Sequence, residues 1–65
     1  MEKITSIRYS GVEGTLWQGT DAEGRTVYTV TTDRDGISVE PNSAEHHTIT
    51  AAVGEFHWSA DQQVW

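Results

Sequence analysis

The sequence predicts an α+β domain in which a four-stranded antiparallel meander over residues 1–40 is followed by one short helix. The chain has nine Thr, six Val and four Ile but only one Leu and one Met. β-Branched side chains pack well on a pleated surface and lose rotamer freedom in helices, so this composition favours strands. A repeated turn signature also favours strands, since residues 21–24 and 33–36 both read Asp-x-acid-Gly. With 65 residues, the chain forms one small domain, residues 1–65.

Each Asp-x-acid-Gly segment lies between strand-like runs. Asp begins a type I turn by accepting hydrogen bonds from its own backbone, and Gly takes the left-handed position that closes a bulged hairpin. A looser turn over residues 10–14 separates the first two runs. The four predicted strands are therefore residues 3–9, 15–19, 25–32 and 37–40.

Residues 41–65 form the C-terminal segment, for which two interpretations remain open. Ser43 is a good cap for a helix that runs to residue 53 and stops at Gly54. Residues 47–53 also alternate as a strand would, with a turn at 54–55 leading into a further strand, which would make the domain all-β. The helix is the preferred interpretation.

Aromatic residues supply the large apolar side chains that so small a core needs. We expect Trp17, Tyr28, Phe56 and Trp58 to be buried or partly buried. We also expect at least one of the three tryptophans to be substantially exposed, where it would serve as an anchor for a partner.

Negative charge is concentrated in the second half of the chain. The formal net charge is −6; residues 1–34 hold five acids and four bases, whereas residues 35–65 hold five acids and no base. This balance excludes a protein that binds nucleic acid directly through phosphate-neutralising side chains, and it opposes binding to anionic membranes. No stretch approaches the roughly 18 apolar residues of a membrane span, so a cytoplasmic location is expected.

Catalytic and cofactor-binding signatures are missing from the sequence. There is no Cys, no Gly-x-Ser-x-Gly elbow, and no glycine spacing of a phosphate-binding loop. The histidines are His46, His47 and His57, and adjacent histidines diverge on either a helix or a strand, so they cannot easily share one metal ion. We therefore expect no enzyme activity, no catalytic residue, no cofactor and no metal.

The acidic composition predicts a binding function. Carboxylates on a surface can imitate phosphates, because they pair with Lys and Arg and accept bidentate hydrogen bonds from Arg. The expected partner is a larger protein with a basic nucleic-acid-binding surface, and the chain itself is expected to be a monomer or a small homo-oligomer. The expected partner-binding residues are Asp35, Glu40, Glu45, Glu55 and Asp61, with Asp33 and Glu23 at the hairpin tips and Trp65 at the chain end.

In size, acidity and lack of cysteine, the chain resembles the small inhibitors that bacteriophages and mobile elements use against host defence, including some anti-CRISPR proteins. The resemblance implies a non-enzymatic inhibitor that mimics DNA and blocks its target by occlusion. Three alternatives remain open. They are an adaptor or immunity-type module that docks through Trp17, Trp58 or Trp65, a structural phage protein, and a His-dependent hydrolase.

Overall fold

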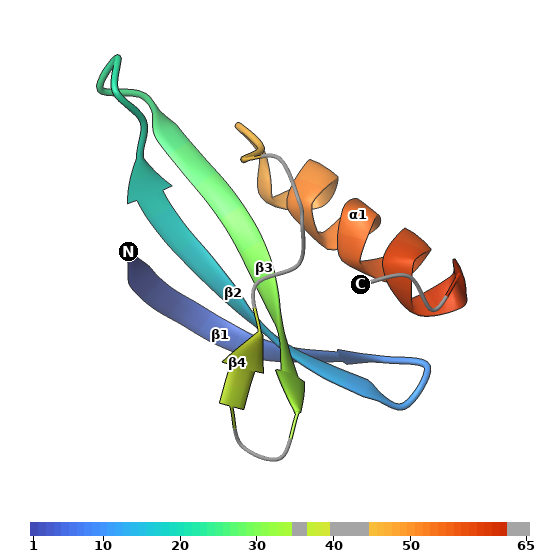
Figure 1. Cartoon of the computed structure of the whole chain (residues 1–65). Helices are drawn as coiled ribbons and strands as arrows, with labels where there is room; N and C mark the ends of the chain where they lie inside the picture. The colour runs from blue at the N-terminus through green and yellow to red at the C-terminus, as the bar shows by residue number, and fades with distance from the viewer. Residues whose placement is uncertain (35–36, 40–44, 63–65) are drawn as a thin grey trace.

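One antiparallel sheet and one helix make up the part of the chain that the computed structural model describes, residues 1–34, 37–39 and 45–62. The strands are β1 (Glu2–Tyr9), β2 (Val12–Thr20), β3 (Thr26–Arg34) and the short β4 (Ile37–Val39), and the helix is α1 (Ile49–Gln62). The strands follow chain order across the sheet, and α1 packs over one face (Figure 1). The α+β class is therefore confirmed.

The first hairpin turn is tighter than the sequence predicts. Tyr9 pairs directly with Val12, so only Ser10 and Gly11 form the turn, and both have positive φ, 52° and 78°. Positive φ at both central residues defines a type I′ turn, whose twist matches that of the flanking strands. The expected loop over residues 10–14 is therefore wrong, and β2 begins at Val12.

The turn between β2 and β3 forms as its Asp-x-acid-Gly signature predicts. Asp21 Oδ1 accepts hydrogen bonds from the backbone N–H groups of Glu23 and Arg25, both at 2.9 Å. Gly24 has a φ of 82°, the left-handed conformation that glycine adopts without steric cost. The second signature behaves differently, because Asp33 pairs with Ser38 inside the sheet instead of beginning a turn. Residues 35 and 36 lie outside the described residues.

The helix begins and ends later than the sequence predicts. Thr48 caps its start, since its Oγ1 accepts a hydrogen bond from Ala51 N–H at 3.1 Å and its carbonyl accepts one from Ala52 N–H at 3.2 Å. Gly54 does not stop the helix, which continues to Gln62. The predicted end at residue 53 is wrong, as is the strand alternative for 47–53, and Ser43 lies outside the described residues.

The core lies between α1 and the β2–β3 pair. Leu16, Val30, Ala52 and Phe56 form one buried cluster. Gly14 faces the same side as Leu16, because a Cβ at Gly14 would lie 2.9 Å from Phe56 Cε1. Five partly buried side chains surround this cluster, namely Ile7, Tyr9, Val12, Tyr28 and Val53.

Three of the four aromatic residues expected to be buried or partly buried are so: Phe56 is buried, and Trp17 and Tyr28 are half-buried. Trp17 Nε1–H donates to Thr31 Oγ1 at 2.8 Å on the sheet face away from the helix. The expectation for Trp58 is wrong, because that side chain is 59% exposed. The expectation that at least one tryptophan is substantially exposed is confirmed by the same residue.

Candidate functional site

The outward side of α1 presents an exposed tryptophan. Ala52, Phe56, Ser59 and Ala60 are the buried residues of the helix, and they turn one side of it toward the sheet. At about 100° per residue, Trp58 lies about 160° around the helix from Phe56 and so points to solvent. Packing of the inner side therefore fixes Trp58 on the outer side.

Two carboxylates flank Trp58 on the same side of the helix. Glu55 precedes it by three residues and Asp61 follows it by three, so each is displaced by about 60° around the helix from the tryptophan. Both acids belong to the partner-binding set that the sequence predicts. We call Glu55, Trp58 and Asp61 the outer triad.

Contacts outside the helix, with Tyr9 on β1 and with His46, hold both carboxylates of the outer triad. The Tyr9 hydroxyl donates a hydrogen bond to Asp61 Oδ2 at 3.2 Å, which links α1 to the end of β1. This hydrogen bond, together with the negative charge of Asp61, raises the pKa of Tyr9 above its ordinary value. Glu55 Oε2 contacts His46 Nε2 in a half-buried pair. Each of the two acids is thus held by a residue outside the helix.

The three histidines make contacts with different groups. The backbone of His46 pairs with that of Tyr28 on β3 through two hydrogen bonds, at 2.6 and 3.0 Å. His47 Nε2 lies 3.5 Å from Asp21 Oδ2, and the His57 ring stacks on Tyr9 with 4.0 Å between centroids. Across the described ranges, no three His, Cys, Asp or Glu side chains gather in a way that could hold a metal ion.

The remaining described acids of the predicted set lie outside α1. Glu23 lies at the tip of the β2–β3 hairpin and pairs with Arg25, whereas Asp33 lies on the sheet face away from the helix. Glu45 is exposed and directly precedes the residue that bridges to β3. The predictions for Asp35, Glu40 and Trp65 lie outside the described residues. Among the described acids of the set, Glu55 and Asp61 are therefore the two that α1 places on either side of Trp58.

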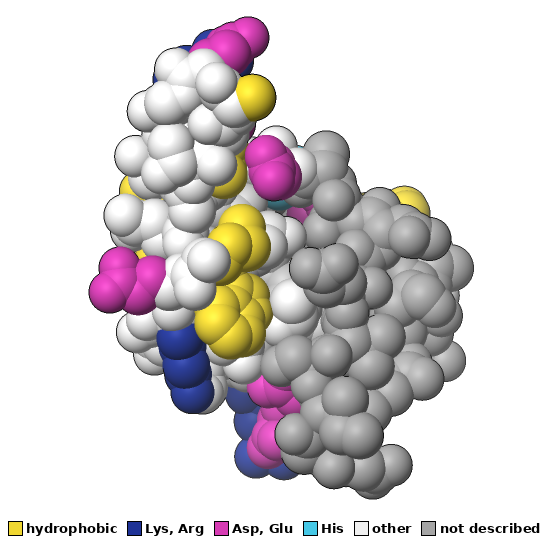
Figure 2. All heavy atoms as spheres, turned by 60° about the vertical axis from the view of Figure 1, so that its left-hand side comes forward, with side chains coloured by type: hydrophobic (Ala, Val, Ile, Leu, Met, Phe, Trp, Pro, Cys, Tyr) yellow, Lys and Arg dark blue, Asp and Glu magenta, His cyan; other side chains and the backbone are white. Residues whose placement is uncertain are grey.

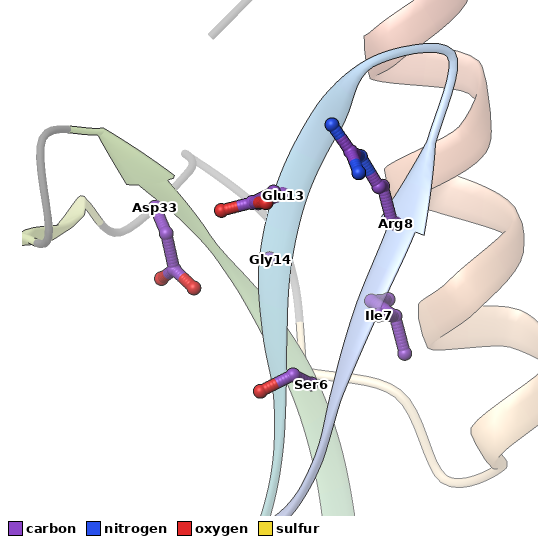
Figure 3. A pocket seen from close by; sticks show the side chains of 6 residues that line it. All are labelled: Ser6, Ile7, Arg8, Glu13, Gly14 and Asp33. Atoms are coloured by element: carbon purple, nitrogen blue, oxygen red, sulfur yellow. The ribbon is translucent and has the colours of Figure 1, made fainter.

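The sheet face away from the helix has an open hollow of about 340 Å³ (Figure 3). Glu13 and Asp33 occupy paired positions on β2 and β3, and together with Arg8 on β1 they line the hollow. Thr15 Oγ1 donates to Asp33 Oδ2 at 3.0 Å. On the side of the molecule seen in Figure 2, hydrophobic side chains gather at the centre and charges of both signs surround them. Arg8, Glu13 and Asp33 therefore give the hollow charges of both signs, whereas the outer triad has only negative charges.

Sequence reasoning did not place Trp58 in the site with the two acids. The signal was present in the spacing of Ala52, Phe56 and Ala60, which recur every four residues and define the inner side of one continuous helix. A residue two positions after Phe56 falls on the opposite side. Ending the helix at Gly54 hid this relation.

Compared with known proteins, the chain matches no family model, no curated protein and no solved structure. Among the residues described, no helix has the length and apolar character needed to cross a membrane.

Proposed function

We propose that the chain is a non-enzymatic binding protein that occludes a nucleic-acid-binding surface of a larger protein, as anti-CRISPR and other anti-defence inhibitors do. The observation that supports this most is the outer triad, in which two fixed carboxylates flank an exposed tryptophan. Residues 45–62 contain three acids and no Lys or Arg, so a positively charged partner meets no repelling base on this segment.

The internal contacts of the triad leave its carboxylates able to bind a partner. A carboxylate has about four lone-pair sites, and the Tyr9 hydroxyl uses one of those on Asp61. A neutral hydroxyl leaves the negative charge of Asp61 in place. Asp61 can therefore accept hydrogen bonds from Arg or Lys side chains that otherwise hold phosphates, and so can Oε1 of Glu55, whose contact with His46 is made through Oε2. Such pairing releases counterions from the partner surface.

Affinity capture with nucleic-acid competition tests this function. The immobilised chain is exposed to a nuclease-treated bacterial lysate, and retained proteins are eluted with duplex DNA or with rising salt and identified by mass spectrometry. We expect nucleic-acid-binding proteins to elute with DNA. We also expect their retention to fall strongly between about 50 and 200 mM salt. Retention that resists both DNA and salt contradicts the proposal.

Charge-matched variants separate the triad from general acidity. Glu55→Gln with Asp61→Asn and Glu2→Gln with Glu13→Gln both change the formal charge from −6 to −4. We expect the first pair to lower retention by about tenfold or more, since hydrogen bonds to charged groups contribute about 1.5–3 kcal/mol each. The second pair should have little effect. Should circular dichroism show that the first pair perturbs folding, the single variants Glu55→Gln and Asp61→Asn, compared with Glu45→Gln at an exposed site outside the helix, give a further test.

The exposure of Trp58 favours a second candidate, an adaptor that docks through this side chain without using charge. In that case Trp58→Ala abolishes retention, the amide variants do not change it, and salt has little effect. The two candidates therefore give opposite results in the same capture experiment.

A further inference from the structure

The outer triad has the order of a nucleotide unit, with an aromatic ring between two negative groups. Glu55 and Asp61 are six residues apart, which separates their Cα atoms by about 9 Å along the helix axis, and Trp58 lies midway. Trp58 is 59% exposed, and its indole ring makes no hydrogen bond or ring contact within the described ranges. The ring is thus available to an external partner.

The surface around the ring leaves room for a partner to enclose it. Gly54 and Ala51 lie in the turns below Trp58 on the same side of α1, and both are exposed. An added Cβ at Gly54 would meet nothing within 4 Å. On the side toward the start of the helix, small residues therefore flank the indole, and a groove of another protein can approach it there.

Single-stranded and double-stranded nucleic acids present different groups to proteins. Proteins that bind single strands combine a basic groove for the backbone with aromatic side chains on which unstacked bases lie. Proteins that hold duplexes contact mainly phosphates, because the bases stay stacked inside the helix. An exposed ring between two carboxylates matches the first arrangement and has no counterpart in the second.

We infer that the surface occluded by this chain is a single-strand-binding groove, in which Trp58 occupies a base-stacking position and Glu55 and Asp61 occupy phosphate-binding positions. This inference rests on the proposed function and narrows its partner class. It assigns Trp58 a stacking role that a simple acidic mimic does not need.

Competitive elution with two nucleic acids tests the partner class. Proteins retained by the immobilised chain are challenged with an oligothymidylate and with a DNA duplex at equal phosphate concentration. We expect the single strand to elute the retained proteins at a lower concentration than the duplex. Equal elution by both nucleic acids, or better elution by the duplex, overturns the inference.

Variants of Trp58 test the stacking role directly. Base–aromatic stacking predicts that Trp58→Leu, which stays apolar but cannot stack, weakens retention about 5- to 150-fold. Trp58→Phe keeps an aromatic ring and should retain most of the binding. Ile4→Ala, at a 42% exposed residue on β1, serves as the control for loss of exposed apolar surface. Equal retention by the Leu and Phe variants overturns the stacking role.

The outcomes distinguish the inference from the proposed function. If duplex and single strand elute equally and only the amide variants of Glu55 and Asp61 lose retention, the phosphate-mimic function stands and the single-strand inference fails. If neither nucleic acid elutes the retained proteins, both fail. Capture of no nucleic-acid-binding protein also overturns both.

Discussion

Gly14 shows how one residue sets the distance between helix and sheet. It lies inside β2 and faces α1, where a Cβ would come within 2.9 Å of both Phe56 Cε1 and the Thr31 carbonyl oxygen. Contacts this short are repulsive, and the carbonyl belongs to the neighbouring strand. The absence of a side chain at Gly14 therefore lets the Phe56 ring rest against the strand backbone.

Replacing Gly14 with Ala should lower the free energy of unfolding by about 1–3 kcal/mol, because an extra methyl group in a packed site forces strand or helix to shift. Urea denaturation followed by circular dichroism measures the change. An unaltered or higher urea midpoint would show that the Phe56 ring can move away without loss.

Tyr9 reports the contact between α1 and β1. Its folded pKa is raised, mainly by the hydrogen bond to Asp61 and then by the carboxylate charge. The contact therefore stabilises the fold fully at pH values below the ordinary tyrosine pKa of about 10. This stabilisation is lost as the pH rises through the pKa of Tyr9 in the folded protein.

Asp61→Asn should bring the tyrosinate titration of Tyr9 back toward about 10, since the amide carries no charge. Ultraviolet absorbance at rising pH follows this titration, and Tyr9→Phe identifies which part of the signal belongs to Tyr9. A titration that is the same in wild type and Asp61→Asn would mean that the contact does not persist in solution.

Single residues were predictable where local chemistry alone determines them. Asp21 and Gly24 form the expected turn because an Asp side chain and a left-handed Gly suffice for it. Trp58 was not predictable in the same way, because its exposure depends on the phase of a helix whose bounds were misplaced. Gly14 was assigned to a turn because glycine usually marks one, whereas here it serves close packing.

At the scale of elements, the two Asp-x-acid-Gly segments differ because sheet pairing competes with turn formation. Asp33 and Arg34 stay in register with Ser38 and Ile37, so the strand continues through the start of the second signature. Asp21 instead uses its side chain in the turn, where Oδ1 accepts two backbone hydrogen bonds. The backbone N–H of Arg25 is the largest cause that holds the pKa of Asp21 below its ordinary value.

The β2–β3 turn should therefore be acid-sensitive. Because the folded pKa of Asp21 is depressed, its contribution to stability is present above about pH 4 and is lost as pH falls through the folded value. Asp21→Asn should lower the melting temperature at neutral pH, and the difference from wild type should shrink below pH 4. Thermal melts of both proteins between neutral pH and pH values below 4 measure this difference in melting temperature. A difference that does not change with pH would contradict a stabilising role for the ionised Asp21 side chain.

The helix bounds could not be read from propensity because packing overrides it. Gly54 and the β-branched residues at the start of α1 disfavour a helix, yet the continuation past Gly54 buries Phe56, Ser59 and Ala60 against the sheet. Burial of the Phe56 side chain alone contributes about 1.5–3 kcal/mol, more than the roughly 1 kcal/mol that one glycine costs.

Gly54→Ala should raise the free energy of unfolding by up to about 1 kcal/mol, because the new methyl group meets no neighbour and alanine favours the helix. Urea denaturation of this variant alongside Gly14→Ala gives a matched comparison, because the two substitutions are expected to change the free energy of unfolding in opposite directions. A loss of stability at Gly54 would show that the helix is distorted at this point.

For the whole molecule, the charge distribution was the property most directly available from sequence. All four bases precede residue 35, and this holds for any fold. Which acids lie on one side of the fold was not available, because it depends on the helix that brings Glu55 and Asp61 to either side of Trp58. Glu23 and Asp33 have the same charge but lie at the hairpin tip and on the opposite sheet face.

Self-repulsion of this charge should be measurable in the free protein. Glu45 lies in a segment without bases, whereas Glu2 is adjacent to Lys3, so removing the two charges has different consequences although both variants reach −5. At low salt, Glu45→Gln should raise the melting temperature by about 1–3 °C, whereas Glu2→Gln should leave it unchanged or lower it. Added salt should raise the melting temperature of wild type more than that of Glu45→Gln, because ions screen the same repulsion that the substitution removes. If the melting temperatures of the two variants respond identically, residues 45–62 experience no net repulsion between their negative charges. Phosphate mimicry by this segment would then lose its electrostatic basis.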